Sequence, residues 1–346
     1  MTAAFLTDAI RVEVVTVGGV ARDIVLTPGG ASQAARAFIG RPAAETAELA
    51  ERLFALCPMA QGAAAACATA AATGAPDAAT PRRVIRLTAE RIGENLRSSV
   101  LSWPLAEDAV GPDPATLTAL RQALAALRAL GAGAPDARGE LDVLDGAVQA
   151  LGLAPGGAPA QGWFGRMRRE AEADGAHFSG GGDARRLTAA DDADVFELMA
   201  RGAAIEPTGG LGAPRAARTL GDLIDARMAE IVAGLDELGA RIAGDGDVGG
   251  RARAYRAGVG HGFAAIESPR GRLYHQARLG VDGRVADWRI LSPTDWNFHP
   301  RGPFAATLAG AALGVGRAAE LRVARLAALF DPCVALRARV REAGDA

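Results

Sequence analysis

Residues 260–302 read GHGFAAIESPRGRLYHQARLGVDGRVADWRILSPTDWNFHPRG, and the interpretation of the whole chain depends on this stretch. Within it, residues 272–279 and 284–291 are rich in strand-forming side chains and flank the pair Asp282-Gly283. An Asp-Gly pair is favoured at tight hairpin turns because it accepts positive φ angles. We therefore expect a β-hairpin here. Four further residues of the stretch frame this hairpin: Pro269, Arg270, Pro293 and Thr294.

The rest of the chain predicts helices, with a second hairpin near the N-terminus. Valine-rich runs on both sides of Gly18-Gly19 predict a β-hairpin over residues 11–26. Residues 31–243 are expected to be mostly helical, with a break at Pro42. Residues 260–346 hold the C-terminal hairpin and an Asp-Pro-Cys motif. We predict one domain over residues 1–346, mostly α with small β hairpins.

Capping residues mark the starts of two of these helices. Asp113 and Pro114 form a favourable pair of N-cap and first helical residue, and Thr219 with Asp222 resembles a capping box. Another predicted helix, residues 82–103, has one apolar face with residues spaced by three and four. Its arginines mostly lie off that face, and we expect them on a solvated surface: Arg82, Arg83, Arg86, Arg91 and Arg97.

The composition is that of a globular protein without a general affinity for polyanions. The chain has 346 residues, of which 49% are hydrophobic and 23% charged, so it can bury a large core. A formal net charge of −2 gives no general attraction to nucleic acid or to an anionic membrane surface. No apolar run of about 18 residues occurs, so we expect no membrane-embedded segment. The N-terminus lacks the features of a secretory signal, and three scattered cysteines suit reduced thiols in the cytoplasm.

Familiar catalytic motifs are missing from the sequence. We find no nucleophile elbow, paired-histidine zinc motif, Walker loop or dinucleotide-binding glycine run in its proper context. The histidines are scattered without metal-ligand spacing, and each one alone is better explained as a structural residue: His177, His261, His275 and His299. Any functional assignment must therefore come from a longer pattern.

Residues 260–302 and the motif Asp331-Pro332-Cys333 together resemble the large subunit of nickel-iron hydrogenases. That family has a Glu-x-Pro-Arg-Gly segment, then Leu-x-His, an Asp-Gly turn, Pro-Thr-Thr-Trp-Asn, and a final Asp-Pro-Cys motif. The matching residues occur here in the same order: Glu267, Pro269, Arg270, Gly271, Leu273, His275, Asp282, Gly283, Pro293, Thr294, Trp296, Asn297, Pro300, Arg301, Asp331, Pro332 and Cys333. The resemblance implies a helical bundle of the hydrogenase-large-subunit type.

The same resemblance implies that the nickel half of the hydrogenase site is lost. In that family four cysteines hold nickel, and two of them bridge to an iron that carries cyanide and carbon monoxide. This chain keeps Cys57 and Cys333 but has Phe54 and Leu336 at the other two positions. Neither replacement offers a donor atom, so we do not expect a thiolate-rich nickel site or hydrogenase catalysis. Gln61 stands where the family has a histidine.

The iron half of the site is better preserved. The resemblance places Pro269, Arg270, Pro293 and Thr294 around the cyanide ligands, and cyanide nitrogen suits a guanidinium and a hydroxyl as hydrogen-bond donors. It also implies Cys57 and Cys333 as the metal ligands. Their sulfurs are expected to approach each other at the end of a central helix bundle. Two points stay open: whether both cysteines bind one iron, and whether Arg270 is only a structural ion-pair partner.

This combination is similar to the narrower HupK/HoxV family, accessory proteins that look like shortened and degenerate large subunits. The resemblance implies a non-catalytic scaffold for assembly or transfer of the iron-cyanide-carbonyl group. It implies as partners assembly proteins of the HypC and HypD kind, and the hydrogenase large subunit itself. Two alternatives remain. One is a nickel-dependent large subunit that is catalytic or senses hydrogen, and the other is a metal-free interaction protein of the maturation complex.

Overall fold

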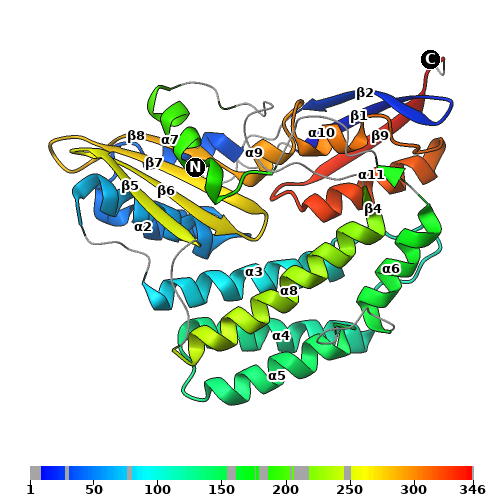
Figure 1. Ribbon diagram of the computed structural model, residues 1–346, viewed down its shortest axis with the longest axis horizontal. Helices are drawn as coiled ribbons and strands as arrows, with labels where there is room; N and C mark the ends of the chain where they lie inside the picture. The colour runs from blue at the N-terminus through cyan, green and yellow to red at the C-terminus, as the bar shows by residue number, and fades with distance from the viewer. Residues whose placement is uncertain are drawn as a thin grey trace.

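The computed structural model describes residues 9–27, 31–75, 80–153, 161–175, 177–178, 186–202, 205, 218–244 and 251–344. Helices dominate these residues and three small sheets accompany them (Figure 1), which confirms the predicted mostly helical α+β class. Parts of the predicted helical middle lie outside the described residues: 76–79, 154–160, 176, 179–185, 203–204 and 206–217. Among the described ones, no helix combines the length and the apolarity that crossing a bilayer requires.

A bundle of long helices forms the lower half of the molecule in Figure 1. In it α3 packs on α4 and α8, α4 on α5, and α6 on α8. Both predicted helix starts are confirmed, because the side chain of Asp113 accepts the N–H of Thr116, and Thr219 with Asp222 forms a complete capping box. The helices of the bundle are α3 (Pro81–Leu101), α4 (Pro114–Ala132), α5 (Ala137–Ala150), α6 (Gly162–Asp174) and α8 (Leu220–Ile242).

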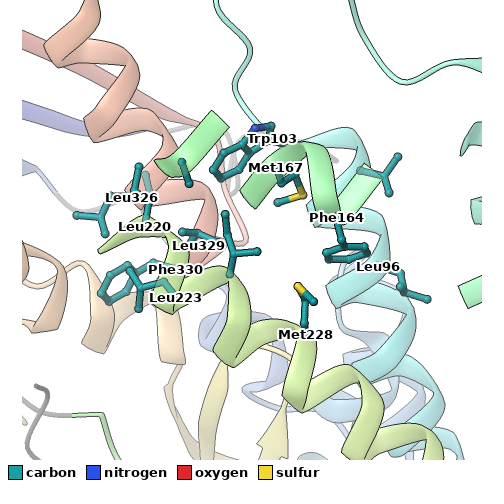
Figure 2. Packing of buried hydrophobic residues seen from close by; sticks show 14 of the residues in the cluster. Leu96, Trp103, Phe164, Met167, Leu220, Leu223, Met228, Leu326, Leu329 and Phe330 are labelled. Atoms are coloured by element: carbon teal, nitrogen blue, oxygen red, sulfur yellow. The ribbon is translucent and has the colours of Figure 1, made fainter. Parts of the chain in front are cut away.

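The core of the bundle continues into the C-terminal part of the chain. Figure 2 shows side chains from α3, α6 and α8 meeting those of α11 (Gly316–Phe330). Leu96, Phe164, Met228 and Phe330 are all buried in this one cluster. The packing therefore joins α11 to helices that lie far earlier in the chain.

A four-stranded antiparallel sheet holds the C-terminal hairpin, which is confirmed as β7 and β8. Two strands that we did not predict precede it, and the order of the sheet is β5-β6-β7-β8. Its strands are β5 (Ala252–Gly258), β6 (His261–Ser268), β7 (Gly271–Leu279) and β8 (Val285–Leu291). Helices cover both faces, since α2 (Pro58–Thr73) packs against one and α7 (Asp192–Ala200) against the other.

A very close approach holds α2 against this sheet. A Cβ atom added at Gly262 of β6 would lie 2.2 Å from the carbonyl oxygen of Ala68, so only glycine fits there. Upstream, the expected break at Pro42 is confirmed between two helical pieces. These pieces are the 3₁₀ helix η1 (Ala31–Phe38) and the pair formed by η2 (Ala43–Glu45) and α1 (Thr46–Leu53).

The N-terminal hairpin is also confirmed, and a strand from the far end of the chain extends it. β1 (Ile10–Val17) pairs antiparallel with β2 (Val20–Thr27) and parallel with β9 (Leu336–Glu342). We did not predict β9. The remaining elements are short: β3 (His177–Phe178), β4 (Arg218–Thr219), η3 (Ala189–Asp191), α9 (Pro293–Asn297) and α10 (Pro303–Leu308).

One of the α3 arginines is not solvated as expected. Arg91 is buried, and its Nη2 lies 3.0 Å from Oε2 of Glu237 on α8. The physical reason is that α8 crosses α3 and covers this side of the helix. The expectation of a solvated position is therefore wrong for Arg91.

Candidate functional site

Cys57 lies at the N-cap of α2, directly after the turn that follows α1. Pro58 occupies the first helical position, where its fixed φ angle and missing N–H suit a helix start. The carboxylate of Glu90 on α3 accepts the backbone N–H groups of Met59 at 2.6 Å and Ala60 at 2.9 Å. Sequence reasoning missed Glu90, because nothing in its helical context indicates that it caps another helix.

Cys333 lies just after α11, in a loop whose geometry is fixed at two points. Asp331 ends the helix with φ of 50°, the one positive φ of a non-glycine residue in the described part of the chain. The backbone N–H of Cys333 then donates to Oγ1 of Thr294 at 3.2 Å. Thr294 follows Pro293 at the start of α9, whose capping box is formed by Ser292 and Asp295.

The structure brings the two cysteines to one cavity of about 100 Å³, enough for a few water-sized groups. Phe54 also lines it, whereas Leu336 is not on the lining and instead begins β9. The cavity lies where α2 and its sheet meet the loop after α11, rather than at the end of the helix bundle as we expected. Its lining comprises Phe54, Ala55, Leu56, Cys57, Gln61, Ile290, Ser292, Cys333 and Val334.

Arg270 is buried and already engaged by protein groups. Its Nε donates to the carbonyl oxygen of Asp331 at 2.8 Å, and its Nη2 donates to Oε2 of Glu94 at 3.0 Å. A longer bond, 3.5 Å, runs from Nη1 to the carbonyl oxygen of Leu56. Its Nη2 also forms an ion pair with Oδ2 of Asp331 at 3.2 Å, so among the described residues one of the five N–H donors, the second on Nη1, has no protein acceptor. The geometry therefore favours a structural ion-pair role without removing every donor.

The other three residues predicted around cyanide do not all lie at the cysteine cavity. Thr294 contacts Cys333 directly through the bond described above. Pro293 and Arg270 line a separate small crevice together with Trp296 and Asn297, and Pro269 lines neither space. Asn297 donates from Nδ2 to the carbonyl oxygen of Arg270 at 3.3 Å, which ties α9 to the turn between β6 and β7.

Burial governs the charge state of both thiols. It raises the pKa of Cys57 to about 12, although the positive charge of Arg270 acts in the opposite direction. Burial also raises the pKa of Cys333, against a hydrogen bond from Thr294 and the charge of Arg270. Both side chains are therefore neutral thiols near pH 7. Because a thiolate is the form that binds metal, loading a metal here must release protons.

Gln61 directs a hydrogen-bond donor at the sulfur of Cys57. Its Nε2 lies 3.9 Å from Cys57 Sγ, and its Oε1 lies 2.8 Å from Nε2 of His275. Burial lowers the pKa of His275 to about 3, so the ring is neutral. Since the Gln61 oxygen accepts, we assign the His275 proton to Nε2. The chain of donors thus runs from His275 through Gln61 to the thiol.

The protein alone provides few metal ligands at this place. In the described part of the chain, no group of three or more histidine, cysteine or acidic side chains is arranged to hold a metal ion. The two thiols are therefore the metal-binding side chains on the lining of this cavity, and thiolates are the ligands that soft metal ions prefer.

Comparisons with known proteins show which family the chain belongs to. A sequence model described as nickel-dependent hydrogenase matches residues 205–337. The chain is 36% identical to the hydrogenase expression/formation protein HupK of Rhizobium leguminosarum bv. viciae over 90% of each chain. It is 31% identical to the hydrogenase expression/formation protein HoxV of Cupriavidus necator, over 87% of this chain and 88% of that one.

The fold is shared with solved hydrogenase structures. The reduced, active nickel-iron-selenium hydrogenase of Desulfomicrobium baculatum superimposes with a TM-score of 0.55, covering 92% of this chain and 95% of that chain. At 15% identity this likeness shows the fold alone. Taken with the two relatives above, it establishes that the chain belongs to the HupK/HoxV family of hydrogenase expression/formation proteins and has the fold of a hydrogenase large subunit.

Proposed function

We propose that this protein is a non-catalytic accessory factor in nickel-iron hydrogenase maturation. In this role it holds the iron-cyanide-carbonyl group during assembly or transfer. The observation that carries the proposal is the shared cavity of Cys57 and Cys333, two thiols from opposite ends of the chain. The names of its relatives, hydrogenase expression/formation proteins, support a role in maturation.

The iron group is cargo in this proposal and not a resident cofactor. Cys57 supplies the first thiolate, and Cys333 supplies a second or holds the group from the opposite wall of the cavity. The Gln61 amide stabilises the thiolate by donating toward Sγ of Cys57. Arg270 adds positive charge beside an anionic group, and its remaining N–H donor on Nη1 suits cyanide nitrogen.

Two alternatives fit the site less well. A nickel-dependent large subunit would need a thiolate at position 54, where the side chain of Phe54 lines the cavity instead. A metal-free interaction protein would have no use for two thiols on one cavity, one of them buried with a donor aimed at it. We propose hydrogenase assembly proteins of the HypC and HypD kind, and the large subunit, as the partners.

The test is to remove one thiol and measure the bound iron. The wild type, co-expressed with the assembly proteins and purified without oxygen, should carry iron, show cyanide and carbonyl stretches in the infrared, and contain no nickel. Cys57→Ala should lose both the iron and the stretches because it removes a metal bond. Cys67→Ala is the matched control, since Cys67 is buried in the same helix but does not line the cavity.

The possible outcomes separate the three functions. Stoichiometric nickel in the wild type would favour a large subunit, and a blank infrared spectrum would favour a metal-free interaction protein. Iron that survives in Cys57→Ala at the wild-type level would show that this thiol is not the ligand. Unfolding curves of the two variants check that neither result comes from a damaged fold.

A further inference from the structure

A second and larger cavity, of about 810 Å³, opens beside the cysteine site. It is a cleft between α3 and α4 that also reaches the turn carrying Cys57. Ala55 and Leu56 line both this cleft and the cysteine cavity, so they form the wall between the two spaces. Anything bound in the cleft would therefore lie against the segment that positions Cys57.

The floor of the cleft is apolar and its rims are cationic. Small residues on both helices keep it open, and Met59, Leu124 and Leu127 provide apolar surface. Four guanidinium groups line it: Arg82, Arg86, Arg97 and Arg128. The expectation of a solvated face for the α3 arginines is thus refined, because three of them share one cleft.

Two of these four arginines have no carboxylate to balance them. Arg97 makes a bidentate pair with Glu94. Nη2 of Arg86 lies 3.5 Å from Oε2 of Glu51. Arg82 donates only to the carbonyl oxygen of Ala132 among its hydrogen bonds in the described residues. Arg128 is exposed and has no hydrogen bond or ion pair there.

The acidic residues of the cleft do not cancel this charge. Glu94 is already shared between Arg97 and the buried Arg270. Glu90 is directed at the backbone N–H groups that begin α2. The cleft therefore presents a net positive rim around an apolar floor, and charge complementarity calls for an occupant with carboxylates and apolar side chains.

The length of the arginine row decides what kind of occupant fits. Arg82 and Arg97 are separated along α3 by about 22 Å at 1.5 Å per residue. A free anion such as phosphate contacts only one point of such a row. An extended peptide advances about 3.3 Å per residue, so about seven residues span it.

We propose that this cleft binds an acidic, apolar-anchored peptide segment of a partner protein and places it against the Cys57 turn. The inference rests on the proposed function only for the kind of partner, which would be a hydrogenase assembly protein. The binding itself needs no metal. Its recognition chemistry is carboxylate to guanidinium at the rims, with leucine-like side chains over Met59, Leu124 and Leu127.

The test uses a labelled seven-residue peptide, acetyl-Glu-Leu-Glu-Glu-Leu-Glu-Leu-amide, and its counterpart with lysine in place of glutamate. Fluorescence anisotropy with the full chain should show binding of the acidic peptide that weakens as salt is raised, and none of the lysine peptide. The double variant Arg82→Glu/Arg128→Glu should weaken binding at least tenfold. Arg138→Glu is the matched control, because Arg138 lies on α5, is 87% exposed and is outside the cleft.

Three results would overturn the proposal: no binding of the acidic peptide, equal binding of the lysine peptide, or unchanged binding in the double variant. Displacement of the peptide by citrate at equal concentration would also overturn it, in favour of a small-anion site. None of these results depends on iron, so failure here leaves the Cys57 test untouched. Conversely, peptide binding together with a blank infrared spectrum of the protein co-expressed with the assembly proteins would remove the scaffold function and keep the docking cleft.

Discussion

At the scale of single residues, Arg270 connects the candidate site to the fold. Its guanidinium joins Glu94 on α3 to the carbonyl oxygen of Asp331, the residue with a positive φ that precedes the Pro-Cys step. A non-glycine residue in this conformation costs of order 1 kcal/mol and persists only when its surroundings fix it. Burial acts against the charge of Arg270, but the carboxylates of Asp331 and Glu94 raise its pKa, so it stays a cation. Arg270 therefore supports the position of Cys333 whether or not it also contacts cargo.

Replacing Arg270 with lysine should separate charge from geometry. Lysine keeps the charge but lacks the planar fork, so it cannot serve Glu94 and Asp331 together. We expect Arg270→Lys to lower the free energy of unfolding by about 2–4 kcal/mol, the size of one or two lost charged hydrogen bonds. Iron retention should weaken without the complete loss expected for Cys57→Ala. Urea unfolding and iron analysis measure the two effects.

Arg97→Lys provides the comparison for that experiment. Arg97 pairs with the same Glu94 but is 25% exposed, and such pairs contribute about 1 kcal/mol or less. A loss of stability in Arg270→Lys no larger than in Arg97→Lys would contradict the structural role assigned to Arg270. Unchanged iron retention in Arg270→Lys would contradict its role toward the cargo.

At the scale of elements, local chemistry predicted some of the structure and missed the rest. The turns at Gly18-Gly19 and Asp282-Gly283 and the helix caps are local signals, and the structure has them where expected. β6 was missed because both of its faces are buried, by α2 and by α7, so polar and apolar residues do not alternate in it. β9 was missed although its sequence, LRARVRE, alternates, because its partner β1 lies at the other end of the chain and no local turn connects the two.

The start of α2 provides a prediction about pH. Burial is the main influence on the pKa of Glu90 and raises it from 4.5 to about 7, although the N–H groups of Met59 and Ala60 act to lower it. A raised pKa in the folded state means that the protein prefers neutral Glu90. The resulting stability is present below pH 4.5 and is lost as the pH rises toward 7.

Glu90→Gln should remove this dependence. Between pH 4.5 and 7.5 the wild type should lose about 3 kcal/mol of unfolding free energy relative to the variant, as the change in pKa implies. Denaturation at a series of pH values measures the difference between the two proteins. Parallel stability curves of the wild type and Glu90→Gln over this range would show that burial does not raise the pKa of Glu90. Glu48→Gln is the matched control, since it makes the same substitution at an exposed position on α1.

At the scale of the whole molecule, the candidate site exists only because distant segments meet. Residues near 57, 292 and 333 line one cavity, and no spacing in the sequence indicates that they do. The resemblance to hydrogenase large subunits indicated that Cys57 and Cys333 belong to one site. It did not indicate Glu90, the departure of Leu336 from the cavity, or the α3–α4 cleft. These depend on packing between elements that lie far apart in the sequence, which short motifs do not specify.

The parallel pairing of β1 with β9 joins two strands from opposite ends of the sequence, and its loss should lower the free energy of unfolding. Seven residue pairs join the strands, from Ile10 with Leu336 to Thr16 with Glu342. Oγ1 of Thr16 donates to Oε2 of Glu342 at 2.6 Å, and Val340 is buried against the main core. Ending the chain after residue 335 would leave these bonds of β1 unmade and expose an apolar strand edge, which favours aggregation.

We expect this truncation to cost at least about 3 kcal/mol of unfolding free energy, from one buried valine and several hydrogen bonds. Guanidinium unfolding and light scattering measure the loss, with a chain ending after Gly344 as the control that keeps β9. If the chain ending at residue 335 unfolds at the same denaturant concentration as that control, β9 does not stabilise the fold.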